Sequence, residues 1–283
     1  MNSNFAILIV NWNSHMDIQK ILDVTPTHIP FVIVDNNSER IEELTEILSQ
    51  FKNVALIRSS VNGGYGYGMN LAISYVKSNN ISENILLLNP DVRLSKEFIS
   101  HVETSCDCFD VLGFQQYTIG PSGEKNFYPC AAYFVKGKIR LASRKIEGRQ
   151  LVDIVTGAAL LFKVSAFDGI GMFDESFFHY KEEFDLCFRM TTAGRTVAID
   201  YEVPLHHEAG SSLAHDSSSA IYYRVRNEIL FARKHRTISI LRSAQNIGAV
   251  IKDCLSSQIP GKFRIISAAI KDGCIGKNGI RGN

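Results

Sequence analysis

The chain has 283 residues, of which 45% are hydrophobic and 21% are charged, as in an ordinary globular protein. This length suits one large α/β domain, alone or with an appendage. The net charge of +1 gives no overall field of the kind that draws a protein to nucleic acid, and no stretch reaches the roughly 18 apolar residues of a membrane-spanning helix.

The charge is unevenly distributed along the chain. Residues 221–283 contain 12 lysines and arginines but 3 acidic residues, whereas residues 1–220 contain 18 basic and 26 acidic residues. A basic region on an acidic body favours an anionic partner such as a membrane surface, and the alternative is a set of solvated helices. We expect a cytoplasmic protein that is soluble or peripherally bound to the inner face of the cell membrane.

The 6 cysteines form no CxxC pair, and their spacing suits neither zinc nor a disulfide framework. Free thiols in a reducing cytoplasm are the economical interpretation. The apolar run at residues 5–10 is too short for the core of a signal peptide, and no basic region precedes it.

The first hundred residues alternate between two patterns. Short apolar, β-rich runs predict strands, and apolar residues at spacings of three and four predict helices between them. The expected strands are 5–10, 31–34, 54–57 and 85–88, and the expected helices are 16–22, 39–50 and 69–77. Such alternation indicates a doubly wound, mostly parallel sheet with helices on both faces.

The rest of the chain is less uniform. Residues 105–150 are irregular, order returns at 151–163, and a strand is expected at 196–203. From about residue 217 the pattern is helical, with further helices expected at 237–256 and 261–272. We therefore expect a sheet domain followed by a C-terminal helical region.

Polar features follow the predicted strands, and ligands of such sheets bind beyond the carboxyl ends of the strands. Asp35 ends the second strand, and its carboxylate could contact a nucleobase edge or a ribose hydroxyl, or it could simply form an Asx turn. The glycines of 62–70 allow close backbone approach to a diphosphate, and the following helix offers amide donors. This loop matches neither GxGxxG nor a Walker motif, and the alternative is a tight turn.

Metal ligands are expected at two places. Asp91, after Asn89 and Pro90, presents a hard oxygen ligand that suits Mg²⁺ or Mn²⁺, unless it is a simple turn residue. His206 and His207 follow a predicted strand, and a histidine there could complete the metal shell or contact a diphosphate. The alternative is a pair of structural histidines.

Acidic residues open the helix that begins near residue 182. Asp185 can pair with Arg189 one turn on, which leaves Glu182 and Glu183 pointing in different directions. One of them could face a cleft as a general base, because neighbouring acids raise its proton affinity. Helix capping is the alternative for at least one of them.

In these motifs the chain resembles glycosyltransferase family 2, inverting enzymes of GT-A fold, and within it the rhamnosyltransferase-like branch. The resemblance covers about residues 5–235, and the order and spacing of its motifs are together more specific than any one motif. The motifs are Val10–Asn13, Val34–Ser38, Asn62–Asn70, Leu88–Asp91, Thr156–Ala159, Gly171–Glu175, Glu182–Arg189, His206–Ser211 and Tyr222–Asn227.

The resemblance implies roles for individual residues. Glu183 would be the catalytic base, with Glu182 as the alternative, although the family usually has aspartate at this place. Asp91 would hold a divalent metal, Mg²⁺ or Mn²⁺, together with His206, or with His207 as the near alternative. The implied nucleotide-sugar ligands are Asn11, Asp35, Asn37, Asn62, Gly63, Gly64, Gly68, Asn70, Asn89, Asp91, Thr156 and Gly157. Asn89 stands where the family's DxD motif has its first aspartate.

The resemblance also implies an organisation and a reaction. Residues 1–215 would form a GT-A, Rossmann-like domain with a donor half at about 1–105 and an acceptor half at about 106–215, and residues 216–283 a basic helical region. The expected reaction moves L-rhamnose from dTDP-rhamnose to a saccharide acceptor, possibly a lipid-linked one, with inversion, in polysaccharide or O-antigen synthesis. Alternatives are a UDP-hexose or UDP-galactofuranose donor, a nucleotidyltransferase, or a domain that binds nucleotide without catalysis.

Overall fold

Strand β1 (Ala6–Asn11) is buried throughout and lies in the middle of the main sheet. Its side chains alternate between two hydrophobic cores: Ala6 and Leu8 face one, whereas Ile7 and Ile9 face the other. This arrangement explains why the run is continuously apolar, because a strand covered on both faces has no polar side. The computed structural model describes residues 3–106, 108–135, 138–142, 147–208, 217–235, 240–256 and 258–281.

The main sheet joins strands from the whole first two thirds of the chain. Its order is β3 (Val54–Arg58), β2 (Phe31–Asp35), β1, β4 (Asn84–Leu88), β12 (Ala159–Lys163), β6 (Val111–Ile119), β13 (Val197–His207) and β10 (Arg149–Leu151). Strands β1 to β4 are mutually parallel, as predicted, and β12 is antiparallel to β4. Short strands extend the sheet, with β5 (Val92–Arg93) beside β13 and β7 (Lys125–Tyr128) beside β6.

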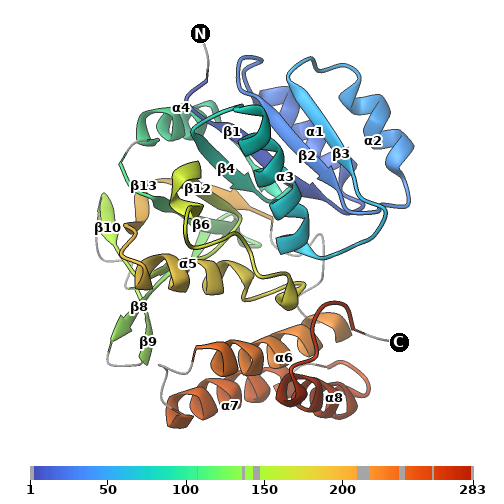
Figure 1. Cartoon of the computed structure of the whole chain (residues 1–283), viewed down its shortest axis with the longest axis vertical. Coiled ribbons are helices and arrows are strands. Elements are labelled where there is room, and N and C mark those ends of the chain that lie inside the picture. The colour runs from blue at the N-terminus through green and yellow to red at the C-terminus, as the bar shows by residue number, and fades with distance from the viewer. Residues whose placement is uncertain are drawn as a thin grey trace.

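Helices cover both faces of this sheet (Figure 1). One core is closed by α1 (His15–Val24), α2 (Ile41–Leu48) and α4 (Lys96–Ser105), and the other by α3 (Tyr65–Asn79) and α5 (Glu182–Thr192). Two 3₁₀ turns, η1 (Val164–Phe167) and η2 (Glu175–Phe177), lead into α5. The expectation of a doubly wound, mostly parallel sheet is confirmed.

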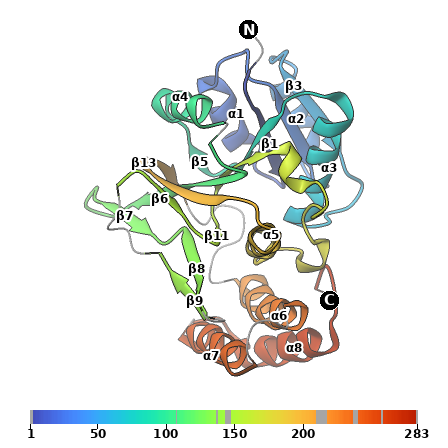
Figure 2. The same cartoon turned by 60° about the vertical axis from the view of Figure 1, so that its left-hand side comes forward.

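A second, three-stranded sheet contains β11 (Ile154–Val155), β8 (Ala131–Val135) and β9 (Lys138–Leu141). It extends from the main sheet toward the C-terminal helices in both views (Figures 1 and 2). Strands β8 and β9 occupy part of the irregular segment 105–150, where the sequence pattern gave no element, and β11 lies in the ordered stretch at 151–163.

The C-terminal helices form a layer with its own hydrophobic core beneath α5 (Figure 1). They are α6 (Ser218–Lys234), α7 (Ile240–Ser256) and α8 (Lys262–Ile275). The core of this layer also takes in Phe178 and Tyr180, which precede α5 and so connect the two layers. No helix in the described part of the chain is long and apolar enough to cross a membrane. The cysteines are free thiols.

Candidate active site

Two adjoining cavities open at the carboxyl ends of the central strands. The strand-end cavity has a volume of about 500 Å³ and is lined by residues that include Trp12, Asn36, Asn62, Gly64 and Pro90. The glutamate cavity has a volume of about 400 Å³ and is lined by residues that include Tyr128, Thr156, Gly157, Glu182, Glu183 and His207. Tyr65, Asn89 and His179 line both cavities, so that the two spaces share a wall.

Glu182 and Glu183 lie in the first turn of α5 and line the glutamate cavity, as the sequence predicted for at least one of them. Glu182 is 5% exposed, and its Oε2 atom has no hydrogen-bond partner among the described residues. The Gly157 amide donates to Oε2 of Glu183 over 3.4 Å. Burial raises the pKa of both carboxyls, and repulsion from Glu182 raises the pKa of Glu183 further.

The neighbouring acid Asp185 is not part of the cavity. As predicted from their spacing, Asp185 and Arg189 form an ion pair, with 2.8 Å between Oδ2 and Nε. Nε2 of His235, the residue that follows α6, lies 2.7 Å from the other carboxylate oxygen. Asp185 is therefore a structural residue that joins α5 to α6.

The backbone that leads into α5 is unusual. Phe178, Tyr180 and Lys181 have φ values of 55°, 68° and 75°, in the left-handed region that side chains other than glycine disfavour. Such residues cost of order 1–3 kcal/mol each and persist only where the surroundings hold them. They set the direction from which α5 begins and hence the position of Glu182 and Glu183.

Two fully buried side chains of α6 hold this segment. Nδ2 of Asn227 lies 2.7 Å from each of the carbonyl oxygens of Phe177, His179 and Tyr180. The Arg226 guanidinium donates to the carbonyls of Ser176 and Phe177 over 3.2 and 3.0 Å. The motif Tyr222–Asn227 entered the sequence resemblance without a role, and its last two residues fix the segment in front of the glutamates.

A chain of hydrogen bonds leads from the sheet to Asp91. The Gln116 side-chain oxygen accepts from the Ala158 amide over 3.1 Å and from the Tyr128 hydroxyl over 2.8 Å. The same hydroxyl lies 2.5 Å from Nδ1 of His207. Nε2 of His207 lies 3.1 Å from Oδ1 of Asp91, which is 4% exposed.

This geometry favours His207 over His206 as the partner of Asp91. The primary prediction for the metal shell was His206, but its ring stacks on Tyr117 with the ring centroids 5.3 Å apart. Adjacent residues of a strand point to opposite faces, so only one of the two histidines of β13 can face Asp91. A carboxylate oxygen and an imidazole nitrogen at this separation are a suitable donor set for a divalent metal.

The predicted nucleotide-sugar ligands divide into residues that line one of the two cavities and residues that line neither. Asn62, Gly64 and Asn89 line the strand-end cavity, and Thr156 and Gly157 line the glutamate cavity. The other predicted residues line neither cavity, and they are Asn11, Asp35, Asn37, Gly63, Gly68, Asn70 and Asp91.

Several of the predicted residues that line neither cavity build the loops around the site. Asn11 donates to Oδ1 of Asp35 over 2.7 Å, and Ser38 donates its amide to Oδ2 over 3.1 Å, so Asp35 has the turn geometry that was its alternative role. Asn70 exchanges hydrogen bonds with the backbone of Phe173. Asn36, which the prediction passed over for Asn37, lines the strand-end cavity.

The glycine loop differs from the predicted diphosphate cradle. The amides of Gly63, Gly64 and Tyr65 donate to Asn36, Asn62 and Phe178 respectively, so these donors are already used. Helix α3 begins at Tyr65, which places Gly68 inside the helix, where a Cβ would come within 2.8 Å of Val10. A Cβ on Gly64 would meet the carbonyl of Phe178. These glycines therefore serve close packing.

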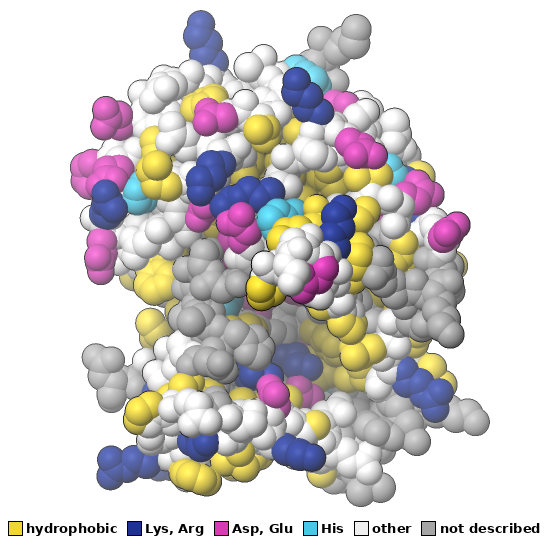
Figure 3. All heavy atoms as spheres, turned by 180° about the vertical axis from the view of Figure 1, so that it is seen from behind, with side chains coloured by type: hydrophobic (Ala, Val, Ile, Leu, Met, Phe, Trp, Pro, Cys, Tyr) yellow, Lys and Arg dark blue, Asp and Glu magenta, His cyan; other side chains and the backbone are white. Residues whose placement is uncertain are grey.

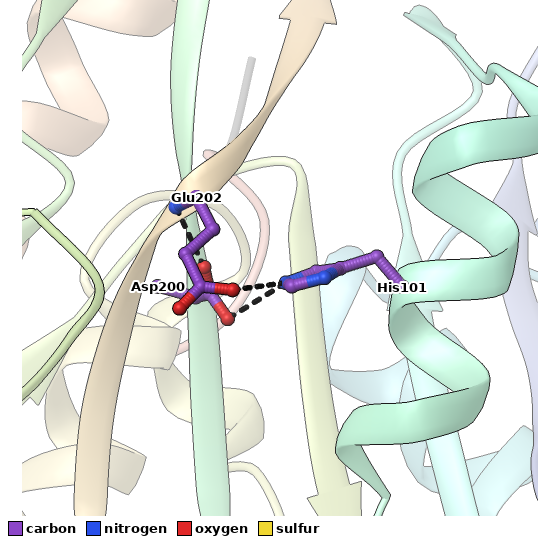
Figure 4. Close-up of side chains that lie close together, drawn as sticks. All are labelled: His101, Asp200 and Glu202. Atoms are coloured by element: carbon purple, nitrogen blue, oxygen red, sulfur yellow. Dashed lines mark hydrogen bonds and ion pairs between the residues drawn. The ribbon is translucent and has the colours of Figure 1, made fainter.

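A separate cluster of His101, Asp200 and Glu202 brings three potential metal ligands together (Figure 4). Nε2 of His101 lies 2.9 Å from Oδ2 of Asp200, and Nε of Arg149 lies 2.7 Å from the same oxygen. Because the guanidinium already supplies the positive charge, this cluster is an ion-pair network that links α4, β10 and β13. It is distinct from the Asp91–His207 pair.

Three relatives resemble most of the chain. The low-salt glycan biosynthesis hexosyltransferase Agl10 of Haloferax volcanii is 28% identical over 81% of the chain and 76% of that protein. Rhamnosyltransferase WbbL of Escherichia coli is 25% identical over 82% of the chain and 94% of that protein. The N-acetylglucosaminyl-diphospho-decaprenol L-rhamnosyltransferase of Mycobacterium tuberculosis is 23% identical over 66% of the chain and 70% of that protein.

Solved structures share the fold. The mannosyltransferase PcManGT of Pyrobaculum calidifontis, in complex with GDP-Man and Mn²⁺, has a TM-score of 0.59 at 10% identity and covers 96% of the chain and 81% of its own. This likeness shows a glycosyltransferase fold. The model of the family "Glycosyl transferase family 2" matches residues 17–171, which is more than half of the chain. The chain is a glycosyltransferase that belongs to glycosyl transferase family 2, in its rhamnosyltransferase-like branch.

Proposed function

We propose that the protein transfers L-rhamnose from dTDP-rhamnose to a saccharide acceptor with inversion, in cell-surface polysaccharide or O-antigen synthesis. The observation that carries this proposal is the buried glutamate pair in a cavity that adjoins the strand-end cavity. The donor nucleotide would occupy the strand-end cavity, and the acceptor hydroxyl would enter the glutamate cavity. The anomeric carbon would lie at their shared wall of Tyr65, Asn89 and His179.

In the proposed reaction Glu183 takes the proton of the acceptor hydroxyl. The hydroxyl oxygen bonds to the anomeric carbon while the bond from that carbon to the diphosphate oxygen breaks, and the electron pair leaves with the diphosphate. A raised pKa suits this role, because a carboxylate that binds protons more strongly is a stronger general base. Glu182 is the alternative base, and separate variants distinguish the two.

Asp91 and His207 would hold a divalent cation, Mg²⁺ or Mn²⁺. When bound, such an ion would offset the negative charge that develops on the leaving diphosphate. The hydrogen-bond chain from Gln116 through Tyr128 orients the His207 ring for this role. Residues that hydrogen-bond to a metal ligand commonly fix its orientation in this way.

The choice of sugar rests on the relatives. Two of them are rhamnosyltransferases by name, and the Haloferax relative is a hexosyltransferase by name, which keeps a UDP-hexose or UDP-galactofuranose donor as the second candidate. Calorimetric titration with dTDP-rhamnose, UDP-galactose and UDP-glucose, with and without Mn²⁺, distinguishes these donors. Tight, metal-dependent binding of dTDP-rhamnose is the expected result. Binding of a UDP-sugar instead would replace the donor, and binding without transfer to any acceptor would indicate a non-catalytic domain.

We also propose that residues 216–283 bind an anionic membrane surface, while residues 1–215 carry the catalytic base and the metal ligands. At the membrane surface the protein would reach a lipid-linked acceptor. The name of the mycobacterial relative describes such an acceptor for that protein. On α8, Phe263 is 71% exposed, and the basic residues Arg264 and Lys271 of the same helix are exposed too. In the rear view the helical layer shows basic side chains among hydrophobic ones (Figure 3).

Vesicle sedimentation tests this membrane proposal. Phe263→Glu should lower binding to vesicles that contain phosphatidylglycerol, because it removes an apolar contact and adds repulsion. Asp23→Asn, an exposed change on α1, is the matched control and should leave binding unchanged. Equal binding of Phe263→Glu and the unchanged protein would show that this face of α8 does not contact the membrane.

A further inference from the structure

Arg281 follows α8 and lines the strand-end cavity, far in sequence from the other lining residues. It is the one lysine or arginine among the described residues that line this cavity. The chain end that carries it lies where the helical layer meets the body in both views (Figures 1 and 2). The C-terminal region therefore contributes a positive charge to the cavity that the sheet domain forms.

A nucleoside diphosphate in this cavity, as the proposed function requires, needs positively polarised partners. The amides of Gly63, Gly64 and Tyr65 are bonded within the protein. His179 lines the cavity too, but burial lowers its pKa to about 4, so the ring is neutral at pH 7. Of the described lining side chains, Arg281 is thus the one that carries a positive charge.

Buried contacts position the segment that bears Arg281. The Arg226 guanidinium donates to the carbonyl of Gly279, and the Gly279 amide donates to the carbonyl of Ser176 over 3.1 Å. The Arg281 amide donates to the Tyr223 hydroxyl over 2.8 Å, and Tyr223 itself lines the cavity. Arg226 therefore anchors both this segment and the segment in front of α5.

The Arg281 side chain has a defined place but weak polar partners. Its guanidinium carbon lies 5.1 Å from the centre of the Tyr222 ring, and Nη1 lies 3.5 Å from the carbonyl of Ser218. These contacts place the guanidinium at the cavity wall, and no ion pair to a carboxylate is found for it among the described residues. A guanidinium can bind two phosphate oxygens at once through parallel hydrogen bonds.

We propose that Arg281 binds the diphosphate of the nucleotide-sugar donor. This role rests on the proposed function and adds a residue that lies outside the segment matched by the family, residues 17–171. It also gives the helical region a part in donor binding. The leaving diphosphate would keep the same contact after the glycosidic bond has formed.

The test compares nucleotide and nucleoside binding by calorimetry at one saturating Mn²⁺ concentration, so that the metal contributes equally to the unchanged protein and the variants. The ligands are dTDP, UDP, thymidine and uridine. Arg281→Ala should weaken binding of the preferred diphosphate about tenfold to a hundredfold, the range of a hydrogen bond to a charged group, and leave binding of the matching nucleoside unchanged. Arg281→Lys should restore part of the loss, because the charge returns without the fork geometry.

Lys52→Ala is the control, because Lys52 is an exposed basic residue before β3 and does not line the cavity. It should bind both ligands as the unchanged protein does. Equal dTDP or UDP affinity of Arg281→Ala and the unchanged protein would overturn the role of Arg281 and leave the proposed function intact. If the unchanged protein binds no nucleotide at all, with or without Mn²⁺, the proposed function itself fails.

Discussion

The hydroxyl of Tyr128 lies 2.5 Å from Nδ1 of His207, and this contact determines which imidazole nitrogen can face Asp91. The backbone N–H of Ala158 donates to the side-chain oxygen of Gln116 and so fixes which end of that side chain faces Tyr128. Because this oxygen can only accept hydrogen bonds, the Tyr128 hydroxyl donates its proton to it. Nδ1 of His207 must then donate to Tyr128. A neutral His207 is left with the lone pair of Nε2 directed at Asp91, which is the form that binds a metal.

Removing this hydroxyl should weaken metal binding. In Tyr128→Phe the His207 ring loses the partner that selects its tautomer, and Mn²⁺ affinity should fall about tenfold to a hundredfold, as is typical for residues that orient metal ligands. Titration of Mn²⁺ followed by electron paramagnetic resonance measures this directly. His207→Ala should abolish binding and His206→Ala should not. The reverse order would restore His206 as the ligand.

Glu183→Gln should stop transfer and keep donor affinity. The amide cannot accept the hydroxyl proton, and general base catalysis is worth about 10²–10⁴-fold in rate. Single-turnover kinetics and calorimetry measure the two quantities separately. Glu182→Gln is the matched control, and a larger loss of turnover there would identify Glu182 as the base.

The pH dependence of turnover follows from the same carboxyl. Burial and the Glu182 charge raise the pKa of Glu183, and the base acts only when ionised. Turnover should therefore rise with pH through a value above the ordinary glutamate pKa of about 4.3. A pH profile of kcat that is already flat at pH 5 would contradict a buried, raised base.

The buried acid pair should also lower stability at high pH. A carboxyl whose pKa is higher in the folded than in the unfolded chain binds more protons when folded, so stability falls as pH rises from the unfolded pKa through the folded one. Glu182→Gln removes this cost. Its melting temperature should exceed that of the unchanged protein by roughly a few degrees at pH 8. Near pH 4, where both carboxyls are protonated, the difference should vanish.

Asn227 should be needed for both stability and turnover. Asn227→Ala leaves buried carbonyls of the segment 177–180 without a donor, and the free energy of unfolding should fall by about 2–4 kcal/mol. Because that segment positions Glu183, kcat should fall as well. Gln245→Ala, an exposed change on α7, is the control for helix content. Denaturant unfolding and kinetics at low temperature give the two quantities.

Sequence pattern alone predicted the donor half well, because each of its elements carries a local signal. The continuous apolar runs are the strands β1 to β4, and the spacing of Asp185 and Arg189 gave their ion pair. Both signals arise within one element. Residues that meet through one helix turn or one sheet edge can therefore be found before the structure is known.

The rest depends on contacts that local pattern does not encode. Strand β13 has a register shift between Asp200 and Leu205, so counting alternate residues along it does not tell which histidine faces Asp91. Asn227 meets backbone some 50 positions away, and Arg281 reaches the cavity through the packing of α8 on α6. Glycine permits both the close approach of a diphosphate and the close packing of neighbouring segments. The sequence of the glycine loop is the same in either case, so it predicted a diphosphate site where the structure shows packing.

The anomeric configuration of the product tests the central claim most directly. The protein is incubated with dTDP-rhamnose, Mn²⁺ and a saccharide acceptor, and the new linkage is examined by nuclear magnetic resonance, with Glu183→Gln beside it. The account predicts a rhamnoside of configuration opposite to that of the donor from the unchanged protein, and little product from the variant. A product that retains the donor's configuration, or equal yield from the variant, would contradict a single displacement with Glu183 as the base.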